Sequence, residues 1–246
     1  MSETGFLPGL NQPTMIPFPH FRYIFPPRAE NALPADLLKT YDNGQYGAQP
    51  KLNGDCTLVF TNGRETHVYN RHRSKFKKTL KLSVADFQSL YRETLNGTKN
   101  KWMVLVGEYM AKSKTNEHGK TWNDKFVIFD IIVFDGIQLI GKTFRERIEL
   151  LDKLYGKEET MITKDGVEKL NFMYATSTEN VFRVKTYYDC FRGMWDTLVK
   201  LTPGTSGMYE GLVLKRLDAK LENGTSEKNN TSSQLKFRKS TKNYKN

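Results

Sequence analysis

The chain has 246 residues and a mass of 28.5 kDa, enough to bury a sizeable core in one large domain or two small ones. Its 38 Lys and Arg residues outnumber its 27 Asp and Glu residues, which gives a formal charge of +11 and a pI near 9.5. This excess favours a polyanionic partner such as nucleic acid. Because Cys56 and Cys190 are the only cysteines, the sequence excludes a disulfide framework and a Cys-rich zinc module.

The first 45 residues form a segment rich in proline, glycine and scattered aromatic residues. This segment lacks the basic start and apolar run of a secretion signal. No stretch of the sequence approaches the roughly 18 apolar residues that a membrane span requires. We therefore expect a soluble, cytoplasmic protein without a membrane partner, in which residues 1–45 pack on the domain that follows.

Helix-like and strand-like patterns alternate through the middle of the chain. Apolar residues with helical spacing follow Ser83, a plausible N-cap, and Gly97 is expected to end this helix. Residues 102–110 and 126–134 are rich in β-branched and aromatic residues, as in buried strands. The polar residues 112–124 between them are expected to form a flexible connection.

The alternation continues to the C-terminal end of the sequence. Residues 144–155 and 188–201 have the apolar spacing of helices, and Gly156 is expected to end the first of them. Residues 209–217 then read as a strand, and residues 221–233 as a polar loop. This order predicts an α+β fold. The sequence contains no glycine-rich phosphate loop, so another device must hold the phosphates of any nucleotide.

Charged residues recur within or beside the apolar strand-like runs. They occur at Lys51-Leu52-Asn53-Gly54, Gly107-Glu108, Asp130, residues 210–215 and residues 235–238. Charges in such runs are costly to bury unless they are paired or bind a ligand. The set therefore predicts a charged, lined pocket.

This ordered set resembles the covalent nucleotidyltransferase superfamily of ATP-dependent DNA ligases, RNA ligases and mRNA-capping guanylyltransferases. The first motif of that superfamily, Lys-Xaa-Asp-Gly, corresponds to Lys51 to Gly54, with Asn53 in place of the aspartate. The later matches are Asn70-Arg71, Gly107 to Met110, residues 126–131, residues 210–215 and residues 235–238, where Arg238 replaces a second lysine.

The resemblance covers about residues 46–239 and implies a nucleotidyltransferase (adenylation) domain over this range. Such a domain is α+β and ATP-grasp-like, with mainly antiparallel sheets flanked by helices. Residues 240–246 would form a basic tail. DNA ligases and capping enzymes continue from the fifth motif into an OB-fold domain, so the short remainder predicts a chain without an OB-fold domain, and we expect a monomer.

The resemblance also implies that Lys51 carries AMP. An amine must be neutral to attack the α-phosphate of ATP, and deprotonating an ordinary lysine at neutral pH costs about 4 to 5 kcal/mol. Lys215 and Lys236 would favour the neutral amine by like-charge repulsion, and they would also neutralise phosphate charge in the transition state.

Further residues of the site follow from the same motif positions. Arg71 and Arg238 would bind phosphate, Glu108 the ribose, and Glu210 a Mg²⁺ ion. Phe126 would stack on adenine, and Gln49 would read the adenine edge. Two of these residues also have a purely structural interpretation. Phe126 has the pattern of a core aromatic, and Glu210 could form a surface salt bridge with Lys215 or Arg216.

Within the superfamily, the passages after Asp130 and between the fourth and fifth motifs are most similar to DNA ligases. The resemblance thus implies an ATP- and Mg²⁺-dependent DNA ligase that joins 5′-phosphate and 3′-hydroxyl ends in nicked duplex DNA or RNA-containing duplexes. We expect a role in DNA repair or replication and a virus or phage source. Asn53 and Cys56 depart from the DNA-ligase pattern and leave an RNA ligase, or a ligase of mixed ends, as an alternative. The sequence also leaves open a GTP-using capping enzyme and a non-catalytic nucleic-acid-binding protein of the same fold.

Overall fold

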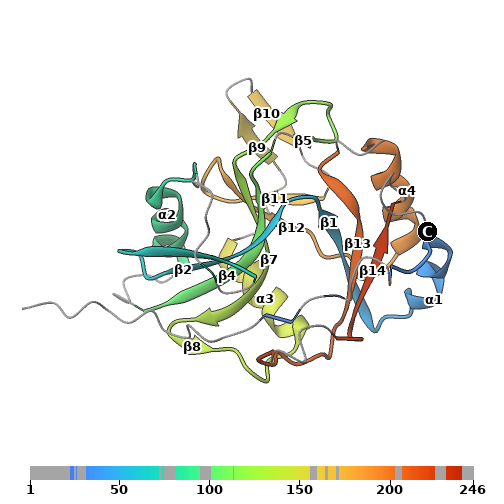
Figure 1. The fold of residues 1–246 in the computed structure, drawn as a ribbon, viewed down its shortest axis with the longest axis horizontal. Helices are drawn as coiled ribbons and strands as arrows, with labels where there is room; N and C mark the ends of the chain where they lie inside the picture. Colours follow the sequence, from blue (N-terminus) through green and yellow to red (C-terminus); the bar gives the residue numbers. More distant parts are fainter. Residues whose placement is uncertain are drawn as a thin grey trace, which may run out of the picture.

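The computed structural model describes most of the chain as an α+β fold, as predicted (Figure 1). The described residues are 23–24, 26, 32–71, 74, 81–94, 101–112, 114–155, 160–163, 166–169, 172–202, 207–224 and 231–239. Within these ranges there are four α-helices and one short 3₁₀ helix, arranged around two sheets and two small hairpins. None of the helices in these ranges has the length and apolar content needed to span a bilayer.

The larger sheet has seven strands, in the order β11-β12-β7-β4-β2-β3, with β8 paired to β7. Their bounds are Met173–Ala175 (β11), Val181–Val184 (β12), Lys125–Phe134 (β7), Met103–Met110 (β4), Asp55–Thr61 (β2), Thr66–Asn70 (β3) and Ile137–Gln138 (β8). All these strands pair antiparallel except β7 and β12, which are parallel. The central strands β4 and β7 are almost wholly buried, because the sheet is covered on both faces.

Two helices cover one face of this sheet, α2 (Val84–Thr94) and α3 (Phe144–Tyr155). The predicted N-cap of α2 is confirmed, because Ser83 Oγ accepts a hydrogen bond from the Asp86 amide at 3.2 Å, and Asp86 Oδ2 accepts one from the Ser83 amide at 3.0 Å. The predicted ends of these helices, Gly97 and Gly156, lie outside the described residues.

The smaller sheet has three antiparallel strands, β1 (Tyr46–Leu52), β13 (Tyr209–Arg216) and β14 (Gln234–Arg238). Its outer face packs on α1 (Leu38–Tyr41) and α4 (Phe191–Leu201), beside the 3₁₀ helix Ala35–Leu37 (Figure 1). The sequence predicted that α4 begins at residue 188. It begins at Phe191, because the preceding Cys190 has a left-handed backbone with φ of 54° and interrupts the helical path.

The chain passes from the smaller sheet to the larger one at the turn between β1 and β2. Gly54 lies in this turn, where an added Cβ atom would come within 2.6 Å of the Tyr109 carbonyl oxygen. Only glycine permits that approach, and it brings the last residues of β1 against β4. The turn thereby places Lys51 at the junction of the two sheets.

Residues 112–124, predicted to be a flexible connection, instead contain a hairpin of β5 (Lys114–Thr115) and β6 (Thr121–Trp122). Asn116 closes its turn, because its side-chain oxygen accepts hydrogen bonds from the amides of His118 and Lys120, each at 3.0 Å. A second hairpin joins β9 (Thr160–Thr163) and β10 (Gly166–Lys169). The polar composition of these residues did not indicate the hairpin, because hydrogen bonds from the buried Asn116 side chain, and not an apolar run, hold its turn.

Part of the N-terminal segment is described, and it contacts the smaller sheet. The Leu33 amide donates a hydrogen bond to the Lys236 carbonyl at 2.8 Å, and the Gln234 side chain donates one to the Ile24 carbonyl at 2.9 Å. These contacts hold Tyr23 between the sheets. The expected basic tail, residues 240–246, lies outside the described residues.

Candidate active site

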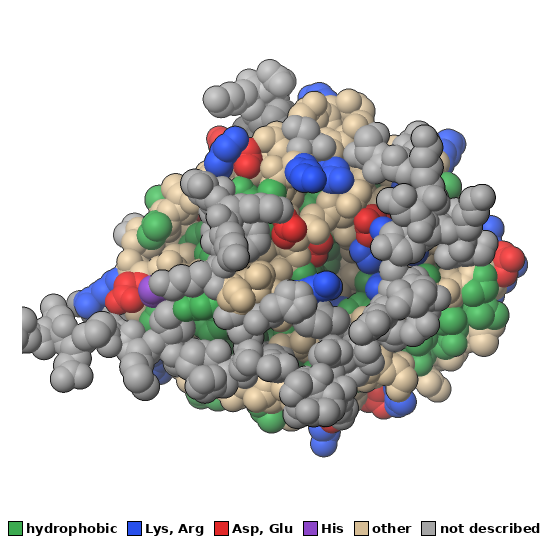
Figure 2. Space-filling model, in the orientation of Figure 1, with side chains coloured by type: hydrophobic (Ala, Val, Ile, Leu, Met, Phe, Trp, Pro, Cys, Tyr) green, Lys and Arg blue, Asp and Glu red, His purple; other side chains and the backbone are tan. Residues whose placement is uncertain are grey.

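A cavity of about 580 Å³ lies between the two sheets. It is lined by Tyr23, Pro26, Gln49, Pro50, Lys51, Leu52, Gly54, Asp55, Cys56, Asn70, Arg71, Glu108, Phe129, Val213, Lys215, Gln234 and Lys236. Figure 2 shows acidic and basic side chains gathered around a hollow near the centre of this face. The predicted charged pocket is therefore present, and its walls come from both sheets.

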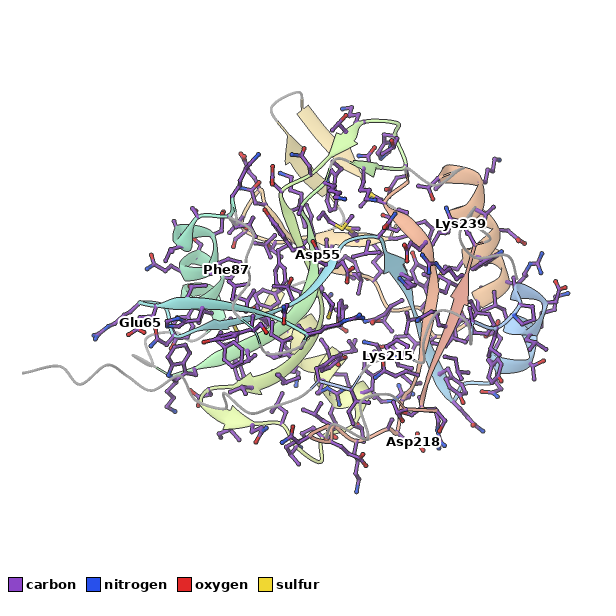
Figure 3. The ribbon with its side chains drawn as sticks, in the orientation of Figure 1. Asp55, Glu65, Phe87, Lys215, Asp218 and Lys239 are labelled. Carbon is purple, nitrogen blue, oxygen red and sulfur yellow. The ribbon has the colours of Figure 1, made fainter. Side chains whose placement is uncertain are left out.

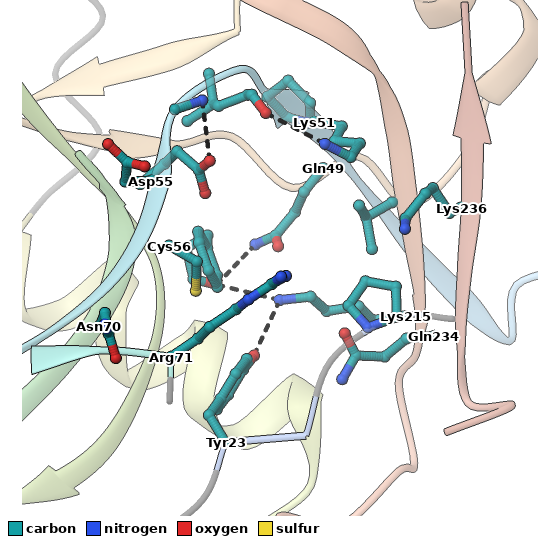
Figure 4. Close-up of a pocket in the computed structure, with 17 residues that line it drawn as sticks. Tyr23, Gln49, Lys51, Asp55, Cys56, Asn70, Arg71, Lys215, Gln234 and Lys236 are labelled. Atoms are coloured by element: carbon teal, nitrogen blue, oxygen red, sulfur yellow. Dashed lines mark hydrogen bonds between the residues drawn. The ribbon is translucent and has the colours of Figure 1, made fainter. Parts of the chain in front are cut away.

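Six of the predicted site residues line this cavity, and three do not. Gln49, Lys51, Arg71, Glu108, Lys215 and Lys236 are lining residues. Glu210 and Arg238 lie beside Lys51 without lining the cavity, whereas Phe126 lies in the core. Figure 4 shows Lys51 and Lys236 toward one end of the cavity, and Tyr23 and Lys215 toward the other.

Lys51 forms an ion pair with Glu210, whose second oxygen accepts a hydrogen bond from Arg238 Nη2 at 3.0 Å. The strand register explains this cluster, because Gly211 pairs with Lys51 on one side and with Arg238 on the other. An added Cβ atom at Gly211 would lie 2.0 Å from the Phe237 carbonyl oxygen, so the close strand pairing requires glycine. Glu210 therefore pairs with Lys51 and Arg238, not with Lys215 or Arg216.

Lys236 lies close enough to Lys51 for their charges to interact. Burial, followed by the positive charges of Lys51 and Arg238, lowers the pKa of Lys236 to about 8. This is the like-charge arrangement predicted around Lys51, with Lys236 as the neighbouring cation.

Lys215 was predicted to be a second cation near Lys51; it lines the same cavity, but its backbone lies further along the paired strands. Lys215 pairs with Gly47 along β1, four residues from Lys51, which corresponds to roughly 13 Å of strand. Its ammonium lies over the rings of Phe129 and Phe144, at 4.9 and 4.8 Å from their centroids. Figure 3 shows Lys215 between the two sheets. Burial lowers the pKa of Lys215 to about 8, although Asp130 opposes this shift.

A buried hydrogen-bond network fixes this end of the cavity. Asp130 accepts two hydrogen bonds from Arg147, and a third from the Tyr23 hydroxyl at 2.6 Å. Lys215 Nζ lies 3.5 Å from the Tyr23 hydroxyl and 4.0 Å from Asp130 Oδ2. The network thus holds Lys215 in place.

Glu108 lines the cavity from β4 of the larger sheet. One of its carboxylate oxygens accepts a hydrogen bond from the Gly54 amide at 3.0 Å. Burial raises the pKa of Glu108 to about 7, while the nearby Lys51 opposes the shift. The strand pairing places Cys56 directly across from Glu108. Burial also raises the pKa of the Cys56 thiol, which disfavours the reactive thiolate.

Phe126 was predicted to stack on a base, but its side chain is fully buried on the other face of β7. It packs edge-on against Phe87 of α2, with the ring centroids 5.9 Å apart. Phe129 lines the cavity instead. The reason is strand alternation, since residues three apart on a strand point to opposite faces.

Gln49 lies at the buried part of the cavity, with its amide nitrogen already occupied. Nε2 donates hydrogen bonds to the Phe129 carbonyl at 3.2 Å and to Thr186 Oγ1 at 3.1 Å. The side-chain oxygen is therefore the group that Gln49 can offer to a ligand. A glutamine held in this way accepts a hydrogen bond from an amino group.

Comparison with models of known protein families found no match, and comparison with curated proteins found none. Among solved structures, the ligase domain of M. tuberculosis LigD matches with a TM-score of 0.54 and 15% identity, over 90% of this chain and 60% of that one. Mycobacterial DNA ligase D complexed with ATP and MES matches with a TM-score of 0.53 and 16% identity, over 90% and 61%. The structure named Pmar-Lig_Pre matches with a TM-score of 0.54 and 15% identity, over 85% and 45%.

This chain has the fold of a DNA ligase's ligase domain. It spans about 60% of the length of the two LigD structures. At this level of identity the ligase-domain fold is what the comparison establishes, and the chemistry must be argued from the side chains.

Within the ligase-domain fold, sequence reasoning missed three residues near the site. Phe129 could have been found from the alternation along β7. Tyr23 could not, because 107 residues separate it from Asp130. Lys114 reaches the site from the β5–β6 hairpin, which the sequence did not predict.

Proposed function

We propose that this chain is an ATP-dependent polynucleotide ligase that carries AMP on Lys51. The observation that carries the proposal is the position of Lys51, at the charged end of a cavity with room for a nucleotide. Glu210, Arg238 and Lys236 surround its amine, so a phosphate that reaches Lys51 meets two further cations and one carboxylate.

The other end of the cavity suits adenine. The ring of Phe129 offers a stacking surface, and the oxygen of Gln49 accepts a hydrogen bond from the exocyclic amino group of adenine. Guanine presents a carbonyl at the corresponding position, which the Gln49 oxygen would repel. This supports ATP over GTP, and a nucleotide bound in this orientation would have its ribose near Glu108.

In the proposed first step, the neutral Lys51 amine attacks the α-phosphate of ATP. A nitrogen–phosphorus bond forms, and the bond to the departing pyrophosphate breaks. Glu210 is placed to accept the proton that Lys51 loses, because the two groups are already hydrogen-bonded. Lys236 and Arg238 stabilise the charge on the phosphate, and Arg71 lines the same cavity.

A Mg²⁺ ion fits this site through Glu210. In the described part of the chain, no group of three or more Asp, Glu, His or Cys residues could hold a metal ion. Mg²⁺ commonly binds to one or two carboxylates and completes its shell with phosphates and water, so Glu210 with the phosphates of ATP is sufficient. The ion would neutralise phosphate charge during the transfer.

In the following steps AMP passes to a 5′-phosphate, and a 3′-hydroxyl then displaces it. The charge of +11 supports a nucleic-acid substrate, whose binding should weaken strongly with salt. DNA is our first choice, because the two LigD structures reported above come from DNA ligase D. RNA or mixed ends are the alternative, and sealing of a panel of nicked duplexes with DNA or RNA on each side of the nick decides between them.

The direct test is incubation with radiolabelled ATP and Mg²⁺, followed by denaturing electrophoresis. We expect a labelled adduct that Lys51→Ala abolishes and that Lys39→Ala, on the exposed face of α1, retains. Labelling with GTP instead would indicate a capping enzyme. An absent adduct together with nucleic-acid binding would indicate a non-catalytic protein and would contradict the proposal.

A further inference from the structure

Lys114 has an ammonium group near the site that no carboxylate of the described residues neutralises. With the Asn53 amide oriented to satisfy both of its atoms, Asn53 Oδ1 accepts a hydrogen bond from Lys114 Nζ at 2.9 Å, and Nδ2 donates one to Glu210 Oε1 at 3.1 Å. None of the ion pairs among the described residues includes Lys114. An aspartate at position 53 would cancel this charge, whereas the neutral amide leaves it in place.

The hairpin holds Lys114 in a defined position. The Met208 amide donates a hydrogen bond to the Thr115 carbonyl, and the Met208 carbonyl accepts one from the Asn53 amide, each at 3.0 Å. The Tyr209 hydroxyl donates to both carboxylate oxygens of Glu117, at 3.2 and 3.0 Å, in a buried contact. The hairpin that carries Lys114 is thus hydrogen-bonded to Met208 and Tyr209, the two residues that precede Glu210.

Lys114 lies outside the cavity, since it is not among the lining residues. Polar contacts run from Lys51 to Glu210, from Glu210 to Asn53, and from Asn53 to Lys114. Gln49 and Phe129, which we assign to the base, are not part of this series of contacts. If AMP is carried on Lys51, a phosphate that extends outward from Lys51 would reach the Lys114 ammonium.

We propose that Lys114 forms a phosphate subsite outside the cavity, on the side of Lys51 away from the base. This inference rests on the proposed function. The phosphate has two possible sources, the pyrophosphate portion of ATP and the backbone of the polynucleotide. An ammonium serves either source as a point charge, because it does not require bidentate geometry.

The test compares Lys114→Gln with Lys101→Gln. Lys101 pairs with Asp135 at 2.8 Å and precedes β4, so it lies at the other end of that strand from the hairpin. Binding of a nicked duplex is measured by fluorescence anisotropy without ATP or Mg²⁺, over a salt series. Loss of one phosphate contact should reduce the slope of log K against log salt by about 0.9 in K114Q. K101Q should keep the wild-type slope, and K114R should recover it.

A second measurement distinguishes the two sources. If the phosphate belongs to ATP, K114Q keeps the wild-type salt slope but needs about tenfold more ATP for half-maximal labelling of Lys51, equivalent to about 1.4 kcal/mol. The proposed subsite would be overturned if K114Q kept both the wild-type salt slope and the wild-type ATP concentration for half-maximal labelling. It would also be overturned if K101Q changed either quantity as much as K114Q does. A melting temperature of K114Q equal to that of the wild type excludes unfolding as the cause of either change. The binding measurement needs no covalent adduct, so failure of the proposed ligase chemistry is recognised separately, by the absence of labelling in the wild type.

Discussion

Arg147 of α3 donates two hydrogen bonds to Asp130 of β7, from Nε at 2.8 Å and from Nη2 at 3.0 Å. The Asp130 side chain is fully excluded from solvent, and that of Arg147 is 7% exposed. Burial by itself raises the pKa of Asp130, but Arg147 and Lys215 outweigh it and hold this pKa below its ordinary value. The pair joins the helix layer to the cavity and supports Tyr23 and Lys215 there.

Asp130→Asn should lower the free energy of unfolding by about 3 to 5 kcal/mol, because it leaves the buried Arg147 without a carboxylate. Urea denaturation measures this change. Asp218→Asn is the matched control, since Asp218 pairs with Arg216 at an exposed position and should change stability little. If both substitutions lowered the free energy of unfolding equally, burial of the Asp130–Arg147 pair would not be the source of its contribution to stability.

Phe129→Leu should raise the ATP concentration for half-maximal labelling, because it removes the ring that we place against adenine. Stacking of a base on an aromatic side chain contributes about 1 to 3 kcal/mol, or roughly five- to 150-fold in affinity. Phe126→Leu should lower thermal stability and leave the ATP requirement unchanged, since Phe126 is buried among core residues. The opposite pattern would restore Phe126 as the residue that contacts the base.

The ATP requirement should also depend on the charge of Lys236. Because its pKa is about 8, Lys236 is positively charged below that pH and neutral above it. The ATP concentration for half-maximal labelling should therefore rise between about pH 7 and pH 9 as the cation is lost. Lys236→Arg keeps its charge throughout this range and should abolish the rise. A rise that persists unchanged in Lys236→Arg would assign the pH dependence to another group.

Gly211→Ala should destabilise the protein by more than about 1 kcal/mol and reduce labelling, because φ at Gly211 is 149° and the new Cβ would overlap the backbone of β14. Gly193→Ala, in α4, meets open space and should increase stability by about 0.5 to 1 kcal/mol. Thermal unfolding of both variants measures the contrast. A Gly211→Ala protein as stable as the wild type would mean that β14 can shift at little cost.

Local patterns were sufficient for much of this protein. Runs of β-branched and aromatic residues located β4, β7 and β13, because strands in a sheet that is covered on both faces are largely apolar. The charged residues in the apolar runs predicted a charged cavity, and the family resemblance implied six of its lining residues, including Lys51 and Glu108.

The remaining features depend on contacts between residues far apart in the chain. Strand alternation and register place Phe129, not Phe126, in the cavity, and they separate Lys215 from Lys51. Tyr23 reaches Asp130 across 107 residues, and Lys114 reaches Asn53 from a hairpin anchored by Met208. Motif spacing records which residue types are present, but their distances are set by strand pairing and packing, which local sequence does not encode.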